Sequence, residues 1–149
     1  MSEVELAEPV RTRGASGVRA QAPVLAVVAL GGGLGALARY GLAQALPTPP
    51  GGFPWSTFVT NVLGCFLIGV LMVLITEVWS AHRLLRPFLG TGVLGGFTTF
   101  STYAVEIRGL LRPGEVPLAF AYLAGTLAAA LLAVILAVWL TRKLTGAVR

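Results

Sequence analysis

Gly95-Gly96-Phe97-Thr98-Thr99-Phe100-Ser101-Thr102-Tyr103 interrupts an apolar segment that is long enough to cross a bilayer. The stretch holds two glycines, four Ser or Thr hydroxyls and three aromatic rings, a composition poorly suited to contact with lipid. Backbone polar groups at membrane depth must be satisfied internally, so broken helices persist only inside protein or beside a water-filled path. The stretch therefore predicts a transmembrane helix that is broken near Gly95–Ser101 and that lines a pathway.

The composition around this stretch is that of an integral membrane protein. Of the 149 residues, 56% are hydrophobic and 11% are charged, whereas a soluble domain carries about 25% charged residues. Four apolar segments each reach the roughly 20 residues that a spanning helix needs. We predict an all-α membrane protein with a single four-span domain over residues 23–149. Its expected spans are about Val24–Leu46, Thr57–Trp79, Pro87–Leu111 and Pro117–Leu140.

The residues before the first span are polar. Residues 1–22 begin with acidic side chains, and the apolar run that follows has spanning length, so they predict an uncleaved tail rather than a secretory signal. The net charge of +5 comes from basic residues at span ends and in loops. Such residues anchor helices to lipid headgroups, which disfavours a nucleic-acid partner.

The sequence lacks the groups that catalysis or proton coupling needs. Cys65 and His82 are the only cysteine and histidine, so they form neither a disulfide nor a transition-metal site. The only acids near the spans, Glu77 and Glu106, lie toward span ends. Proton-coupled transporters carry an ionisable group inside the membrane, and hydrolases need a nucleophile with a base, or a metal. We therefore expect no enzyme activity.

The polar side chains inside the spans are neutral hydrogen-bond donors. Stripping water from a compact anion costs tens of kcal/mol in an apolar medium, and each donor returns only about 1.5–3 kcal/mol, so several donors must act in series. Aromatic ring edges are positive as well, and Phe100 and Tyr103 share one helix face. The whole set favours a binding path for a small anion. Each residue alone could instead hold two helices together through a hydrogen bond. The members of the set are Thr57, Asn61, Ser101, Thr102, Tyr103, Tyr122 and Thr126.

The glycine pair has two interpretations. An unwound turn would free backbone carbonyls near Gly95 and Thr98, and carbonyl oxygens bind hard cations. Alternatively, the pair is a simple kink repaired by neighbouring hydroxyls. The residues alone leave both readings open.

The first span contains the glycine run 31–35. Gly31 and Gly35 stand four residues apart, a spacing that lets helix backbones approach closely in lipid. Four helices of this size form a slim bundle, so an enclosed pathway is expected between subunits, most simply in a C2 dimer.

The chain resembles the Fluc (CrcB) family of fluoride ion channels over roughly residues 28–140. The resemblance rests on the runs Gly31–Tyr40, Thr57–Phe66 and Gly95–Tyr103, of which the last two are specific in combination. It implies a passive, fluoride-selective channel that exports fluoride from the cytoplasm and relieves its toxicity. It further implies a multi-pass protein of the bacterial plasma (inner) membrane, an antiparallel (dual-topology) homodimer, and a structural sodium ion (Na+) at the dimer interface.

The resemblance also implies roles for single residues. Asn61 and Phe100 match pore positions, Arg39 matches a vestibule arginine, and the backbone carbonyls of Gly95 and Thr98 match sodium ligands. Tyr103 replaces a phenylalanine that many members carry, which keeps a ring edge and adds a hydroxyl. The candidate fluoride pathway comprises Arg39, Thr57, Asn61, Phe100, Ser101, Tyr103, Tyr122 and Thr126.

Two alternatives remain from the sequence. A small multidrug-resistance type transporter has a similar size but needs a glutamate in its first span, and Val24–Leu46 contains no acid. A non-transporting membrane scaffold subunit would explain the small-residue packing but not Asn61 and the polar break.

Basic residues are distributed unevenly between the two sides that four spans would define. The side of the termini and middle loop holds eight and the other side three, so the termini are expected in the cytoplasm. Such a bias favours pairing with an oppositely oriented paralogue as an alternative to self-pairing. The eight are Arg11, Arg13, Arg19, Arg83, Arg86, Arg142, Lys143 and Arg149, and the three are Arg39, Arg108 and Arg112.

Overall fold

The computed structural model describes residues 14–79 and 82–146, which form helices and loops with no strand among them. The predicted all-α class is confirmed for this part of the chain. The elements are α1 (Gly14–Ala45), α2 (Trp55–Val73), η1 (Leu74–Val78), η2 (Pro87–Leu94), α3 (Gly95–Phe97), α4 (Phe100–Leu110) and α5 (Val116–Thr145), where η1 and η2 are π-helical.

Within the described residues, three helical stretches are long and apolar enough to cross a membrane. They are Gln21–Ala45, Trp55–Val78 and Val116–Thr145. The remaining predicted span, Pro87–Leu111, is helical but interrupted. Neither half of it has the length that a straight crossing requires.

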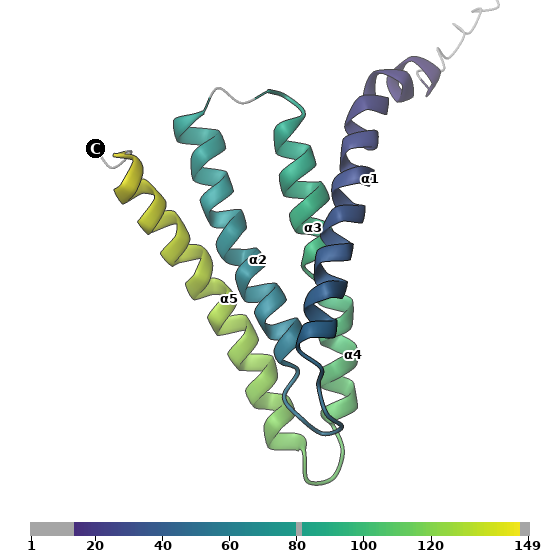
Figure 1. The fold of residues 1–149 in the computed structure, drawn as a ribbon, viewed down its shortest axis with the longest axis vertical. Helices are drawn as coiled ribbons and strands as arrows, with labels where there is room; N and C mark the ends of the chain where they lie inside the picture. Colours follow the sequence, from purple (N-terminus) through teal and green to yellow (C-terminus); the bar gives the residue numbers. More distant parts are fainter. Residues whose placement is uncertain (1–13, 80–81, 147–149) are drawn as a thin grey trace, which may run out of the picture.

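Helix α1 begins earlier than the sequence indicates. It starts at Gly14 and passes through Pro23, so residues 14–22 of the expected polar tail are helical, whereas residues 1–13 lie outside the described part. Proline removes one helical hydrogen bond and bends the helix. The start of α1 is indeed angled away from the rest of the bundle (Figure 1).

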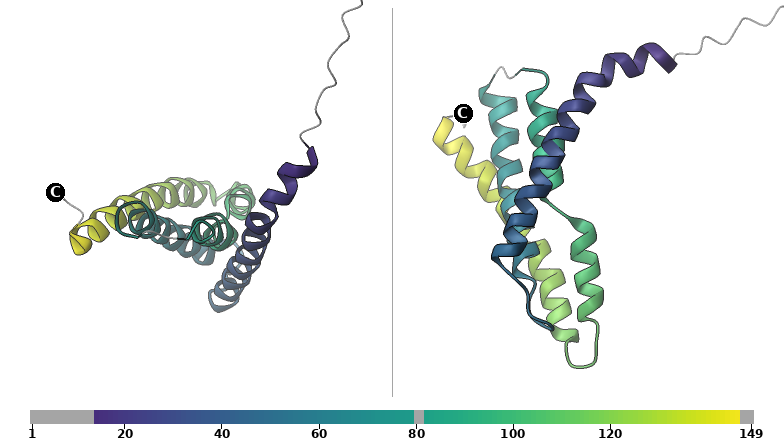
Figure 2. Two further views of the ribbon diagram at one scale, coloured as in Figure 1. Left: turned by 90° about the horizontal axis from the view of Figure 1, so that it is seen from above. Right: turned by 45° about the vertical axis from the view of Figure 1, so that its right-hand side comes forward.

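The helices form a bundle with two main contacts. α2 packs along α5, and α1 packs along η2 and α3. α1 begins and α5 ends at one end of the bundle, where η1 also ends and η2 begins, and the α1–α2 and α4–α5 loops lie at the opposite end (Figure 1). α4 is displaced sideways from the line of η2 and α3, so the interruption offsets the two halves of this segment (Figure 2).

The break falls at two threonines rather than at the glycine pair. Gly95 has ordinary helical angles (φ −66°, ψ −36°), whereas Thr98 (φ −75°, ψ 157°) and Thr99 (φ −149°, ψ 124°) are extended. The Thr99 side chain then caps α4 by accepting the N–H of Thr102 at 3.1 Å. The predicted interval Gly95–Ser101 contains the break, but Gly95 and Gly96 themselves stay helical.

The glycines serve helix packing instead. A methyl group on Gly96 would overlap the Gly32 carbonyl of α1. One on Gly35 would overlap the Val93 carbonyl and lie 2.7 Å from the Phe97 nitrogen. The close approach predicted from the α1 glycine run is therefore confirmed.

This contact predicts a contrast between two glycines of one helix. Gly35→Ala should destabilise the protein by about 1–3 kcal/mol, because overpacking a tight contact forces backbone shifts. Gly33→Ala is the matched control, since a Cβ there meets nothing within 4 Å. Thermal unfolding of both variants in detergent measures the difference, and equal midpoints would contradict the assigned contact.

Candidate functional site

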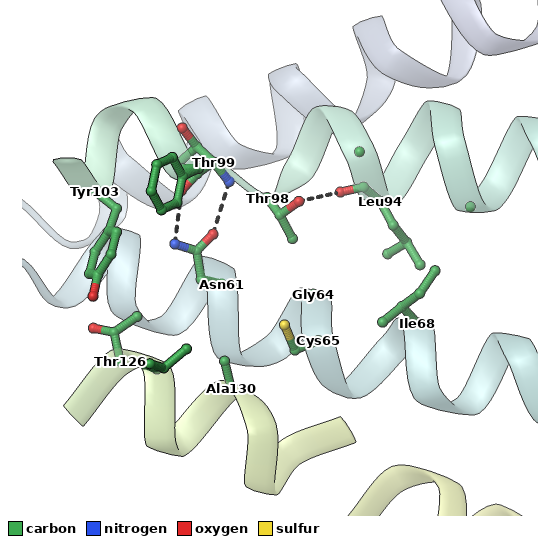
Figure 3. A pocket seen from close by; sticks show the side chains of 14 residues that line it. Asn61, Gly64, Cys65, Ile68, Leu94, Thr98, Thr99, Tyr103, Thr126 and Ala130 are labelled. Carbon is green, nitrogen blue, oxygen red and sulfur yellow. Dashed lines mark hydrogen bonds between the residues drawn. The ribbon is translucent and has the colours of Figure 1, made fainter. Parts of the chain in front are cut away.

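The break opens onto a cavity of about 400 Å³ that α2, the broken segment and α5 line together (Figure 3). Six of the ten predicted site residues line this cavity: Asn61, Gly95, Thr98, Phe100, Tyr103 and Thr126. No lining residue within the described part of the chain is charged. We refer to it below as the main cavity.

Asn61 holds the broken backbone in place. Its Nδ2 donates to the Thr99 carbonyl at 2.9 Å, and its Oδ1 accepts the Thr99 N–H at 2.9 Å, as the dashed lines in Figure 3 show. An amide offers one donor and one acceptor side by side, which matches the pair of groups on one extended residue. Asn61 therefore joins two segments as well as lining the main cavity.

Two hydroxyl groups of residues that line the main cavity already have partners. Tyr103 donates its hydroxyl to the Leu123 carbonyl of α5 at 2.6 Å, and Thr98 donates to the Leu94 carbonyl at 2.9 Å. A hydroxyl has one proton to donate. In this structure, Tyr103 therefore offers its ring to the main cavity, and Thr98 offers a lone pair of its hydroxyl oxygen. Neither has a free donor.

Two donors on the main cavity remain free among the described residues. Asn61 has a second amide N–H without a partner, because only one is used on Thr99. The Thr126 hydroxyl is buried and has no hydrogen-bond partner, and the whole residue is only 4% exposed. Buried polar groups are nearly always paired, so Thr126 indicates that a polar partner or occupant belongs here.

A second cavity of about 100 Å³ lies beside the same turn, and some of its lining residues are charged. It is lined by Arg39, Thr57, Glu106 and other hydroxyl residues, and Thr99 lines both cavities. The Arg39 side chain contacts the broken segment, because its Nε donates to the Gly96 carbonyl at 3.3 Å. The vestibule arginine expected from the resemblance is thus tied to the broken segment.

Glu106 is the residue that the sequence analysis missed. Its Oε1 accepts the Thr57 hydroxyl at 2.9 Å and its Oε2 accepts the Tyr122 hydroxyl at 2.7 Å. Tyr122 is fully buried, and Thr57 is 5% exposed. Both predicted donors therefore bind a carboxylate in this structure. The sequence does contain a signal for Glu106. It follows Phe100 and Tyr103 at intervals of three residues, which places all three on one face of α4.

Two of the predicted residues, Phe100 and Ser101, lie at the surface of the chain. Phe100 is 80% exposed, with its ring centroid 6.0 Å from that of Tyr103. Ser101 is exposed, and its Oγ lies 3.3 Å from Thr99 Oγ1. Ser101 does not line the main cavity within the described residues.

Comparison with known proteins gives one consistent family. The profile of the family described as "CrcB-like protein, Camphor Resistance (CrcB)" matches residues 26–138. "Fluoride-specific ion channel FluC 1" of Streptomyces coelicolor is 65% identical over 128 residues, covering 86% of this chain and 83% of that relative. "Fluoride-specific ion channel FluC 2" of Nocardia farcinica is 62% identical over 126 residues, covering 85% and 90%.

The geometry separates the roles of Asn61 and Phe100. Asn61→Ala should lower fluoride flux and cost about 1–3 kcal/mol of stability, because two backbone groups of Thr99 lose their partner. Phe100→Ile should lower flux with little loss of stability, since the ring is mostly exposed on the subunit. Flux from vesicles and unfolding in detergent measure the two effects. Equal losses of stability in Asn61→Ala and Phe100→Ile would contradict the structural role that we assign to Asn61.

Proposed function

The chain belongs to the family of CrcB-like proteins, and from this premise we propose that it is a passive, fluoride-selective channel. It exports fluoride from the cytoplasm and so relieves fluoride toxicity. It is a channel and not an enzyme. The small multidrug-resistance alternative, which rests on size alone, has no support in this family membership.

The observation that carries the proposal is the main cavity with its free neutral donors. Asn61 and Thr126 each hold an unused proton there, and Phe100 and Tyr103 add ring edges. Neutral donors replace the water that a small anion loses and still let the anion leave. A fixed cation at low dielectric would instead bind the anion too tightly. Fluoride is the smallest halide and accepts the shortest and strongest hydrogen bonds from such donors, so the same set favours fluoride over larger halides.

The proposed assembly is an antiparallel dimer in a bacterial inner membrane, with the broken segment as the third of four spans in each subunit. The large exposed fraction of Phe100 beside the main cavity supports a second subunit there, because a pathway must be closed on that side. The partner is a second copy or an oppositely oriented paralogue. The common placement of the start of α1 and the end of α5 (Figure 1) accords with an even number of spans.

The uneven distribution of basic residues bears on that choice. Basic residues gather at one end of the bundle, as the sequence indicates. At this end, the η1–η2 connection carries Arg83 and Arg86, and the end of α5 carries Arg142 and Lys143. Arg11, Arg13 and Arg149 lie outside the described residues. Positive residues hold their loops in the cytoplasm, so self-pairing requires that copies insert against this bias.

The broken turn also fits a sodium ion. The N–H of Thr99, which would bond the Gly95 carbonyl in a continuous helix, binds Asn61 instead. The N–H of Thr102, which would bond the Thr98 carbonyl, binds the Thr99 hydroxyl. Both carbonyls named by the family resemblance have therefore lost their helical donors, and unwound carbonyls suit Na+. Sodium bound there would fix the turn and supply no chemistry to the anion.

The functional proposal predicts selective efflux. Purified protein in vesicles loaded with potassium fluoride should release fluoride down its gradient without a proton gradient, and an ion-selective electrode should record it. Chloride-loaded vesicles should retain their content. Comparable chloride release would overturn the selectivity, and the absence of fluoride release from well-folded protein would favour the scaffold alternative.

The sodium proposal predicts a dependence on the cation. Replacing sodium by N-methylglucamine should lower flux and thermal stability together, because the free carbonyls lose their partner. Gly95→Ala should weaken the response to sodium, and it should still fold, since a Cβ at Gly95 lies 3.8 Å from its nearest neighbour, the Gly90 carbonyl. Gly33→Ala is the control. Unchanged flux and stability in sodium-free buffer would identify the turn as a simple break.

A further inference from the structure

Phe53, in the loop between α1 and α2, lies at the centre of an aromatic cluster. Its ring centroid is 4.5 Å from that of Trp55, 5.5 Å from that of Phe58 and 5.2 Å from that of Tyr122. The rings of Phe53 and Tyr122 meet edge to face, at 81°. Phe53 is thus the point where a loop touches a fully buried tyrosine of α5.

The backbone holds Phe53 in this position. Gly51 takes a positive φ of 72°, and its Cα faces the Glu115 carboxylate at the start of α5. The Gly52 N–H binds the Pro49 carbonyl at 2.9 Å, and the Trp55 N–H binds the Phe53 carbonyl at 2.8 Å. A turn built in this way presents one side chain in one direction, so the contact with Tyr122 is not incidental.

Tyr122 connects this loop to the second cavity. Its hydroxyl donates to Glu106, and its ring also lies 5.1 Å from the ring of Tyr103, which lines the main cavity. A ring rotation at Tyr122 would therefore move two groups at once. It would release one oxygen of Glu106 and remove the support behind Tyr103.

We propose that Phe53 is a positioning residue for fluoride conduction and acts through Tyr122. The edge-to-face contact fixes the Tyr122 ring, so the hydroxyl stays on Glu106 and, with Thr57, holds this carboxylate in one position at the second cavity. Without Phe53, the carboxylate gains freedom and water, and its negative charge opposes an anion. The inference rests on the proposed function, because conduction is its readout.

The single variants test the contact. Phe53→Leu should slow fluoride efflux by about twofold to tenfold, the factor in a rate that the loss of one edge-to-face aromatic contact represents. Phe53→Tyr, which keeps the ring, should restore wild-type efflux. Trp55→Leu is the matched control, because it removes a ring neighbour of Phe53 that does not pair with Tyr122 within the described residues, and it should conduct normally.

A double-mutant cycle tests the route through Tyr122. Tyr122→Phe removes the hydroxyl, so Phe53→Leu in that background should cause no further loss of efflux, whereas independent effects would multiply. If Phe53→Leu protein is not monodisperse, Phe53→Met takes its place, because it keeps apolar volume without a ring. Multiplicative losses, or equal slowing by Trp55→Leu, would overturn the inference. Wild-type protein without fluoride efflux would instead overturn the proposed function together with it.

Discussion

A backbone that unwinds inside a membrane must find hydrogen-bond partners within the protein, and this constraint organises the whole subunit. Asn61 supplies two partners to Thr99, Arg39 supplies one to Gly96, and the Thr99 side chain supplies one to Thr102. These groups come from α1, α2 and the turn itself. The bundle therefore has to pack closely around the break, which is why glycines line the contact between α1 and the η2–α3 segment.

The same constraint explains why polar groups gather at one depth. A residue that satisfies the broken turn must lie beside it, next to one of the two cavities that the turn adjoins. Asn61 is the clearest case, since one N–H binds the backbone and the other is left over. In the proposed channel, structural and conducting roles thus meet in one side chain. A mutation there cannot be assigned to either role from flux alone, because loss of the turn also removes the site.

Sequence reasoning located the break and the residue types around it, but it did not locate the free protons. Glycines are common at helix breaks, yet whether they unwind depends on what they pack against, and Gly96 lies against Gly32 of α1. Hydroxyl residues can be counted from the sequence. Whether Tyr103, Tyr122 or Thr57 has a proton to spare depends on Leu123 and Glu106, whose positions only the packed bundle defines. The π-helical η1 and η2 carry no signal in the sequence that we recognise.

The two cavities differ in charge, and Thr99 stands between them. The main cavity has neutral lining residues, whereas Arg39 and Glu106 line the other, each hydrogen-bonded to protein groups. Because Thr99 lines both, an ion that passes from one to the other must pass the turn that Asn61 fixes. In the proposed channel, Arg39 can then attract an anion at one stage, and neutral donors can carry it at the next, where a fixed charge in low dielectric would hold it too long. The turn at Thr98 and Thr99 is therefore both the interruption of the helix and the place where we propose that selection occurs.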